Sequence, residues 1–491
     1  MNISELVVFI VYLIAMLGIG VFFFTRAKGG EKEFFLGGRQ MGPWVTALSA
    51  GASDMSAWVL MGLPASIFAA GMGQTWIAIG LAIGYILSWI IVAPRLRRFS
   101  IVANDSITIP QYLTNRFLSK SKALQVICAI IFLFAYAIYA ASSIKACGTL
   151  FNTVLGINAS LAMYIAAFII IAYTFMGGYN AVCWTDFFQG LLMLAALMVA
   201  PIFALAMVNA GTAIATDVVF PANFWSFLSS GKMDWGSWAD ILTGFGWGLG
   251  YFGMPHIIIR FMGIRSQRDV KKSAVVGIVW NVLILAFAVA VGSIGRLFLG
   301  ELTDSSLVFI TMVRSIFPAV ISGILLSAIL SAAMSTADSQ LLASASAFAA
   351  DVYKPILRKK ATEKEMFWSG RIIVIVIAIA AVIIAANPNS GSIMNLVGNA
   401  WGVFGAAFGP VIVLSLFWKR FTFAGAITGI LVGAAVDIIW LAVPALSGTG
   451  LYEIIPGVVA GTIFAIIATL VSSKPSKEVE VMFDKSVAYN D

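Results

Sequence analysis

Long runs of apolar residues alternate with short polar segments along almost the whole chain. Each run is close to about 20 residues, the length of helix that crosses the hydrocarbon core of a bilayer. The runs are continuous, whereas membrane strands alternate apolar and polar positions, so membrane helices are favoured over a β-barrel. We predict 13 membrane spans, with ends uncertain by about two to four residues, at 4–24, 41–63, 69–93, 123–144, 158–176, 186–208, 239–259, 273–298, 318–349, 367–386, 392–417, 421–444 and 453–472.

The composition agrees with this pattern. Of the 491 residues, 61% are hydrophobic and only 11% are charged, against about 25% charged residues in a typical soluble domain. A soluble enzyme, a disordered chain and a secreted disulfide scaffold are therefore excluded. The three cysteines lie in or beside apolar segments and predict no pairing. The sequence predicts an all-α polytopic protein whose surroundings are a lipid bilayer.

The basic residues predict the orientation of the chain. Of the 30 Lys and Arg residues, 26 fall in the tail or in loops that follow odd-numbered spans. Because cytoplasmic loops are enriched in Lys and Arg, we expect the N-terminus outside and the C-terminus in the cytoplasm. The net charge of +8 forms no single patch, so no nucleic-acid partner is expected, and no obligatory protein partner is evident. No cleavage site follows the first span, which we expect to be retained.

Two spans contain residues that interrupt helices. Residues 48–58 combine Gly51 with three serines and Asp54, and residues 243–256 contain five glycines and Pro255. Interrupted helices survive at membrane depth where they line a protein cavity. A pair of them at corresponding positions indicates the central site of a transporter. Spans 2–6 and 7–11 then form a five-plus-five inverted repeat, although close helix packing also explains such small residues.

Several polar residues within the spans are candidates for chemistry. A carboxylate such as Asp54 at the centre of a span is costly and requires a cation, hydrogen-bond donors or a proton. Ser335 and Thr336 offer two adjacent hydroxyls suited to a small hard cation, and interhelical hydrogen bonding is their alternative role. The single histidine, His256, follows Pro255, and either a structural role or proton coupling fits it.

Aromatic residues within spans suggest the wall of a binding pocket, because membrane Trp and Tyr usually lie at the interfaces. Tyr139, Trp247 and Tyr251 are such residues, and core packing is the alternative for each. Together with Ser56 they could hold a small zwitterion whose carboxylate favours the positive end of a half-helix. Because a single histidine leaves few general bases, we do not expect the protein to be an enzyme.

At these residues the chain resembles the sodium/solute symporter family, and within it the bacterial branch that transports proline. The resemblance runs from about residue 4 to 472. The segments that carry it are Phe34–Arg39, Ala50–Trp58, Phe175–Tyr179, Trp247–Pro255 and Ser331–Leu342. It implies thirteen helices around a five-plus-five core.

The resemblance also implies roles for particular residues. Sodium is implied to bind the backbone carbonyls of Ala52, Met55 and Ala332 and the hydroxyls of Ser335 and Thr336. L-proline is implied to contact Ser56, Tyr139, Trp247, Tyr251 and Pro255. Three further residues are implied in ion coupling: Asp54 near the ion, Asp186 on its exit route, and Arg39 in the inner gate.

The resulting expectation is sodium-coupled symport of L-proline across a bacterial cytoplasmic membrane, with sodium as the co-transported ion. The alternative is a sodium- or proton-coupled symporter of another amino acid, an organic acid or a sugar. We divide the chain into a first helix and loop (1–40), a first repeat with an external loop (41–238), a second repeat (239–418), two additional helices (419–472) and a cytoplasmic tail (473–491).

Overall fold

The computed structural model describes residues 2–26, 31–176 and 178–489. Within these ranges the regular elements are helices and there is no β-strand, so the predicted all-α class is confirmed. Gly177, in the motif Phe175–Tyr179, lies outside the described residues.

The helices follow the predicted spans closely in position. The first half of the chain contains α1 (Ile3–Arg26), α2 (Glu31–Leu36), α3 (Pro43–Asp54), α4 (Leu63–Ala70), α5 (Thr75–Leu87), α6 (Ala93–Val102), α7 (Ile109–Arg116), α8 (Ala123–Leu155), α9 (Ala159–Met176) and α10 (Tyr179–Asn209). The second half contains α11 (Trp235–Leu249), α12 (Pro255–Met262), α13 (Gln267–Leu299), α14 (Val308–Ile316), α15 (Ala319–Ala347), α16 (Glu363–Ala386), α17 (Ile393–Phe417), α18 (Phe423–Ala442), α19 (Pro444–Ser447), α20 (Ile454–Val471) and α21 (Lys477–Ala488).

Ten helical segments among the described residues are long and apolar enough to cross a bilayer. The three remaining predicted spans are the second, fifth and seventh. The second is divided among α3, the π-helical turn η2 (Trp58–Gly62) and α4, and the seventh among α11, the 3₁₀ turn η5 (Gly250–Phe252) and α12. The fifth corresponds to α9, whose apolar part, residues 159–172, is shorter than the apolar parts of the other ten helical segments.

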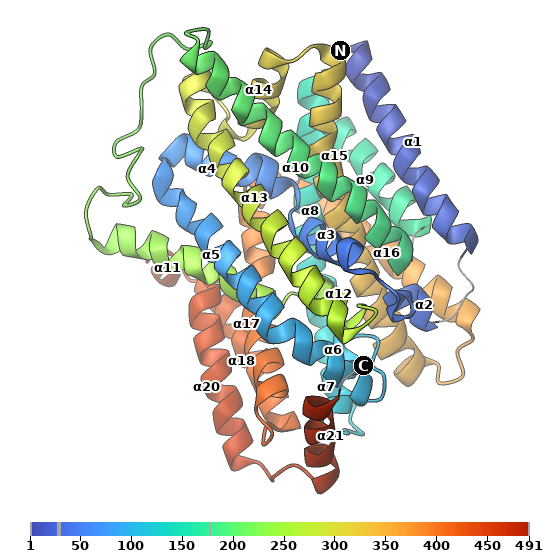
Figure 1. The fold of residues 1–491 in the computed structure, drawn as a ribbon. Helices are drawn as coiled ribbons and strands as arrows, with labels where there is room; N and C mark the ends of the chain where they lie inside the picture. Colours follow the sequence, from blue (N-terminus) through green and yellow to red (C-terminus); the bar gives the residue numbers. More distant parts are fainter. Residues whose placement is uncertain (1, 27–30, 177, 490–491) are drawn as a thin grey trace.

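The centre of the molecule is built around α3. This short helix packs against α10, α12, α13 and α15, so it is enclosed by helices from both halves of the chain. The first helix, α1, lies at the periphery against α10 and α15, and α18 and α20 form a separate layer against α17 (Figure 1). Residues of α3 from Val45 to Asp54 are buried. The fold therefore places the interrupted segments at its centre.

Glycines bring α5 and α11 into direct backbone contact. A Cβ atom at Gly80 would lie 1.8 Å from the carbonyl oxygen of Gly244, and one at Gly84 would lie 2.2 Å from that of Gly248. No side chain fits between the two helices at these positions. The close approach ties the first half of the second interrupted span to α5.

The C-terminal tail contains a helix, α21, that is docked on α6. The ring of Phe483 in α21 lies 5.8 Å from that of Phe99 in α6. Asp484 forms an ion pair with Lys419 at 2.7 Å. These contacts with the rest of the protein therefore stabilise the helix of the tail.

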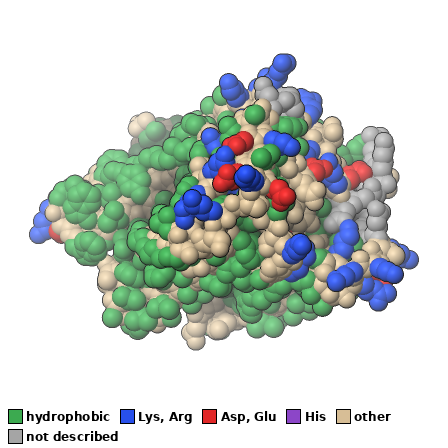
Figure 2. Space-filling model, turned by 90° about the horizontal axis from the view of Figure 1, so that it is seen from below, with side chains coloured by type: hydrophobic (Ala, Val, Ile, Leu, Met, Phe, Trp, Pro, Cys, Tyr) green, Lys and Arg blue, Asp and Glu red, His purple; other side chains and the backbone are tan. Residues whose placement is uncertain are grey.

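Basic side chains gather on one face of the molecule. Viewed from below, Lys and Arg side chains gather over one face with a few Asp and Glu among them, and hydrophobic side chains surround them (Figure 2). Lys419 and Arg358 are exposed basic residues that pair with acidic neighbours. The opposite end carries the long segment between α10 and α11 (Figure 1).

Candidate functional site

The first interruption frees backbone carbonyls at the centre of the protein. Helix α3 ends at Asp54, and Met55 leaves the helical region with ψ 71°. In a continuous helix the amide of Ser56 would bond to the carbonyl of Ala52, but it donates instead to the carbonyl of Asp54 at 2.8 Å. The Ala52 carbonyl is thereby released from the helix ladder. Such groups persist within a membrane protein only when other protein groups satisfy them.

Helix α15 supplies those groups. The hydroxyl of Ser335 donates to the Ala52 carbonyl at 2.8 Å and also lies 3.3 Å from the carbonyl of Ala332. The Thr336 hydroxyl lies 3.5 Å from the same Ala52 oxygen. The structure thus brings four of the five residues implied as sodium ligands together. The fifth, Met55, closes the last turn of α3 through its amide, which donates to Gly51 at 2.9 Å.

Asp54 lies beside these oxygens and faces the second interruption. Its carboxylate accepts a hydrogen bond from the hydroxyl of Tyr251. Its other oxygen, Oδ1, is buried and has no hydrogen-bond partner among the described residues. No hydrogen bond joins this carboxylate to Ser335 or Thr336. The Asp54 carboxyl group therefore lies outside the hydrogen-bonded group of Ala52, Ala332, Ser335 and Thr336.

Glycines at the second interruption allow close contacts with α17. A Cβ atom at Gly253 would lie 2.5 Å from the amide nitrogen of Gly409, and one at Gly250 would lie 2.0 Å from the indole nitrogen of Trp401. Met254 is extended, with ψ 107°, and Pro255 begins α12. Proline suits the first turn of a helix because the amide hydrogen it lacks has no helical partner there.

The residues implied to bind substrate lie between the two interruptions. The hydroxyl of Tyr139 lies 3.4 Å from the carbonyl oxygen of Asp54. The Ser56 hydroxyl caps the next turn by accepting from the amide of Trp58 at 3.4 Å. The ring of Trp247 stacks on that of Trp58, with centroids 6.3 Å apart. Pro255 is buried four residues after Tyr251.

Two aromatic residues missed by sequence reasoning complete this wall. Trp401 donates from its indole nitrogen to the carbonyl of Trp247 at 2.8 Å, and its ring lies 5.1 Å from that of Tyr251. Tyr452 stacks on Trp247 at 5.0 Å. Both come from the C-terminal part of the chain, and only three-dimensional packing brings them to the interruption.

His256 is enclosed rather than accessible. Its Nδ1 lies 3.2 Å from the hydroxyl of Tyr136, and its backbone amide donates to the same oxygen at 3.0 Å. The side chain is fully buried. These contacts fit the structural role left open by the sequence.

A second polar cluster surrounds Asp186 on α10. Its Oδ2 accepts from the Ser49 hydroxyl at 2.7 Å and pairs with the guanidinium of Arg260 at 3.3 Å. Arg260 also donates to Ser339 and to the carbonyl of His256. Asp186 and Arg260 are each about 1% exposed or less. The cluster therefore joins α3, α10, α12 and α15.

Arg260 was not identified as a site residue from the sequence, which counted it among the basic loop residues. It is the only charged residue in α12, whose eight residues are all buried. A charge inside such an apolar run requires a partner. This need for a partner was the sign in the sequence that Arg260 belongs to a buried polar site.

Arg39 forms a third cluster at the basic end of the molecule. It donates to Asp105 at 3.0 Å, to the Ser100 hydroxyl at 3.0 Å and to the carbonyl of Ser106 at 2.8 Å. It also donates to the carbonyl of Met262 at 2.5 Å. Burial lowers the pKa of this guanidinium and the charge of Asp105 raises it, but arginine stays protonated in proteins.

The same end is closed by a short backbone bridge. The amide of Met41 donates to the carbonyl of Gly263 at 3.3 Å, and the amide of Arg265 donates to the carbonyl of Met41 at 3.1 Å. The start of α3 is thus tied to the end of α12. With the contacts of Arg39, this bridge joins the segments before α3 and after α12 at the basic end.

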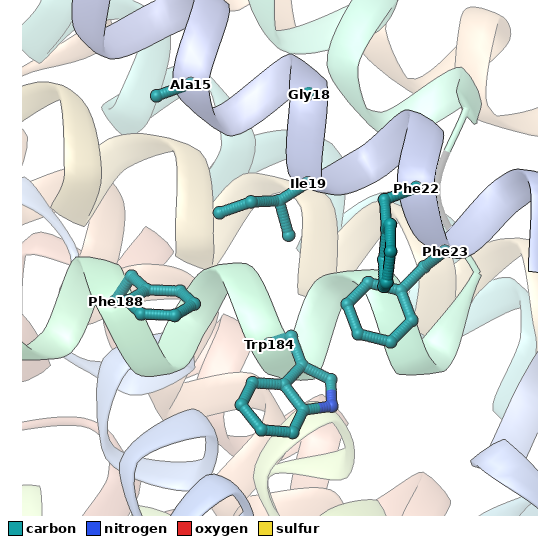
Figure 3. A pocket seen from close by; sticks show the side chains of 7 residues that line it. All are labelled: Ala15, Gly18, Ile19, Phe22, Phe23, Trp184 and Phe188. Carbon is teal, nitrogen blue, oxygen red and sulfur yellow. The ribbon is translucent and has the colours of Figure 1, made fainter.

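A separate apolar groove lies between α1 and α10 (Figure 3). Its lining residues are Ala15, Gly18, Ile19, Phe22, Phe23, Trp184 and Phe188. None of the predicted site residues contributes to it, and it offers no charged side chain. Among the described residues there is likewise no group of three or more His, Cys, Asp or Glu side chains that could hold a metal ion.

Comparison with known proteins defines the family. The model of the sodium:solute symporter family matches residues 34–433. The chain belongs to this family. A sodium/proline symporter of Staphylococcus aureus (strain USA300) is 42% identical over 488 residues, which cover 97% of this chain and 94% of that protein.

Solved structures support the fold. A sodium-coupled sialic acid symporter in a substrate-bound, outward-open state aligns with a TM-score of 0.79 at 20% identity, over 97% of this chain and 99% of that one. A nucleobase-cation-symport-1 family transporter in a closed conformation aligns with a TM-score of 0.55 at 16% identity, over 92% and 97% of the two chains.

Proposed function

We propose that the protein couples the inward movement of sodium to the uptake of L-proline by alternating access. Family membership supports a sodium-driven symporter, and the 42% identical relative is named as a sodium/proline symporter. The observation that carries the proposal is the Ala52 carbonyl, which the interruption of α3 releases and which meets the hydroxyls of Ser335 and Thr336.

In this proposal sodium binds where α3 and α15 meet. The carbonyls of Ala52, Met55 and Ala332 and the hydroxyls of Ser335 and Thr336 provide five neutral oxygens, the ligand type that a hard cation prefers. The hydroxyls that now bond to Ala52 would turn their oxygens toward the ion. Asp54 supplies a nearby negative charge without occupying a ligand position.

Proline would lie in the adjacent aromatic wall. Its ring is apolar and its ammonium group is cationic, so the faces of Trp247 and Tyr251 suit both parts. Ser56 and Tyr139 offer hydroxyls for polar contacts, and Pro255 begins the half-helix on the other side. Asp54 connects the two sites, because its backbone meets Tyr139 and its side chain meets Tyr251.

Transport requires that both sites open alternately to the two sides. The contacts of Arg39 and the bridge between Met41 and Ile264 hold the basic end closed. Sodium would stabilise this shape by joining α3 to α15. Release of the inner contacts, with Asp186 on the ion's path, would then open the basic end. Sodium and proline each favour the same state, so each should tighten binding of the other.

We further propose that the chain crosses a bacterial cytoplasmic membrane thirteen times, with the N-terminus outside and the C-terminus in the cytoplasm. Repeat one (41–238) would contain α3 to α10 and repeat two (239–418) α11 to α17. Each interrupted span would be the first span of its repeat. The first helix with its loop (1–40), the two helices of 419–472 and the tail (473–491) would lie outside the core. The basic surface of Figure 2 supports this orientation.

The test is labelled proline uptake into proteoliposomes at fixed pH and clamped voltage, with and without an inward sodium gradient. We expect accumulation above equilibrium only with the gradient. The variant Asp54→Cys, correctly inserted, should lose the sodium-stimulated part. Accumulation of proline without sodium under a proton gradient would show that the coupling ion is the proton. Failure to accumulate proline, together with accumulation of another amino acid, an organic acid or a sugar, would show that the solute is a different one.

A further inference from the structure

Two acidic side chains converge in the C-terminal helices, outside the sites described above. Asp437 lies in α18 and Glu453 directly precedes α20. A Cβ atom at Gly402 of α17 would lie 2.8 Å from Oδ1 of Asp437 and 3.3 Å from Cγ of Glu453. Both acidic side chains therefore converge on one glycine, and three helices hold them there.

Asp437 is buried without compensation. The side chain is 0% exposed, and neither carboxyl oxygen has a hydrogen-bond partner among the described residues. Buried polar groups without a partner are rare in folded proteins and indicate a missing ligand or proton. Glu453 is 9% exposed. Two charged side chains that converge on one glycine, one of them fully buried, would be strongly unfavourable.

No basic side chain offsets these charges from the surrounding elements. Helices α17, α18, α19 and α20 contain no Lys, Arg or His. Helix α11, which packs on α20, carries Asp240 as its charged residue. The remaining titratable neighbour is Tyr452, whose hydroxyl donates to the carbonyl of Gly398 at 2.6 Å.

Two neighbouring glycines pack closely on the Asp437 side chain. Gly402 lies against the Asp437 carboxyl group on one side, and a Cβ atom at Gly457 would lie 3.2 Å from the Cβ of Asp437 on another. Backbone atoms of α17 and α20 therefore pack closely on the Asp437 side chain. A proton needs only the two carboxyl oxygens.

We propose that Asp437 and Glu453 form a proton-binding site, in which the two carboxyl groups share one proton. The proton leaves as a unit charge when the pair ionises, and no other reactant is required. The site is separate from the predicted sodium ligands, and its residues lie outside both repeats.

The site is connected to the aromatic wall through a single residue. Tyr452 directly precedes Glu453 and stacks on Trp247 with centroids 5.0 Å apart. A change of charge at Glu453 therefore acts next to the predicted proline pocket. The pair also lies at the end of α18 and α20 that the predicted orientation places outside. We infer that external protons adjust proline affinity through this pair, a consequence that rests on the proposed function.

Infrared spectroscopy of the purified, full-length protein tests proton binding without transport. The C=O stretch of a protonated carboxyl group should be present at neutral pH and disappear at alkaline pH. Asp437→Asn and Glu453→Gln should each remove the intensity of one carboxyl group from this titration, while the control Asp240→Asn should retain it. The two variants act independently, so failure of one to fold leaves the other as the test.

Two results would overturn the site. One is a titrating band that survives both substitutions unchanged. The other is loss of the band on adding sodium at fixed pH, which would make sodium the ligand. In proteoliposomes, the half-saturating proline concentration should vary with external pH in the wild type and vary at least several-fold less in Asp437→Asn. An unchanged pH profile would overturn the link to transport, while loss of all proline uptake by wild-type protein would instead overturn the proposed function.

Discussion

The hydroxyl of Tyr251 donates a hydrogen bond to the carboxylate of Asp54, and both side chains are fully buried. Tyr251 belongs to the second interrupted segment and Asp54 to the first. A single hydrogen bond thus connects a residue of the implied substrate wall to the charge beside the implied sodium ligands. We expect the coupling of the two proposed sites to depend on this contact.

Replacing Tyr251 with Phe should weaken sodium coupling while preserving the ring packing. A hydrogen bond to a charged group contributes about 1.5–3 kcal/mol, so the sodium concentration for half-maximal uptake should rise by roughly ten- to hundred-fold. Tyr85→Phe is the control, because Tyr85 packs on Tyr251 and its hydroxyl has no hydrogen-bond partner among the described residues. Equal sodium dependence in both variants would refute the role of the Tyr251 hydroxyl.

Replacing Ser335 with Ala removes one implied ligand and the hydrogen bond to Ala52. We expect sodium-stimulated uptake to fall by at least about ten-fold at low sodium and to recover partly as sodium is raised, since weaker binding responds to concentration. The matched control is Ser344→Ala on the same helix, whose hydroxyl donates to the Gln340 carbonyl of its own helix. A comparable loss in the control would indicate damage to α15 itself.

Replacing Arg260 with Met leaves the buried carboxylate of Asp186 without its counter-ion. Breaking one half of a buried pair costs about 3–5 kcal/mol, so thermal unfolding of the purified protein should occur at a clearly lower temperature. The double variant Arg260→Met/Asp186→Asn should recover much of this stability, because the unpaired charge is gone. Additive losses in the double variant would contradict the pairing.

Replacing Arg39 with Lys keeps the charge but loses the forked geometry that reaches several acceptors at once. We expect the basic end to open more often, which can be measured with a cysteine introduced at the buried Met262 after the three native cysteines are replaced. An impermeant maleimide should label it several-fold faster in inside-out vesicles. Lys32→Ala is the control, because Lys32 touches the same Asp105 from an exposed position, where ion pairs contribute at most about 1 kcal/mol. Equal labelling rates would exclude a gating role for Arg39.

The sequence was sufficient for the membrane class and for the family. The interruptions could be located because Gly51, Asp54 and Pro255 act locally on the helix that contains them. The grouping of Ser335 with Ala52 was reached through the resemblance, since the residues themselves also fitted ordinary interhelical hydrogen bonds.

What the sequence could not provide depends on contacts between distant segments. Trp401 and Tyr452 join the aromatic wall across more than 150 residues, and no periodicity records such a neighbour. Arg260 was assigned to a loop because the count of basic residues treats every arginine near a span end alike. The docking of α21 depends on Phe99, which lies nearly 400 residues earlier in the chain.

The glycine contacts between α5 and α11 have a practical consequence for following the transport cycle. Two helices whose backbones touch at Gly80 and Gly244, and again at Gly84 and Gly248, have no slack through which one can slide past the other. A pair of spectroscopic labels on the exposed faces of these helices should therefore report one constant distance in every state. That pair can serve as the fixed ruler against which a second pair, placed across the bridge between Met41 and Ile264, reveals how far the basic end opens.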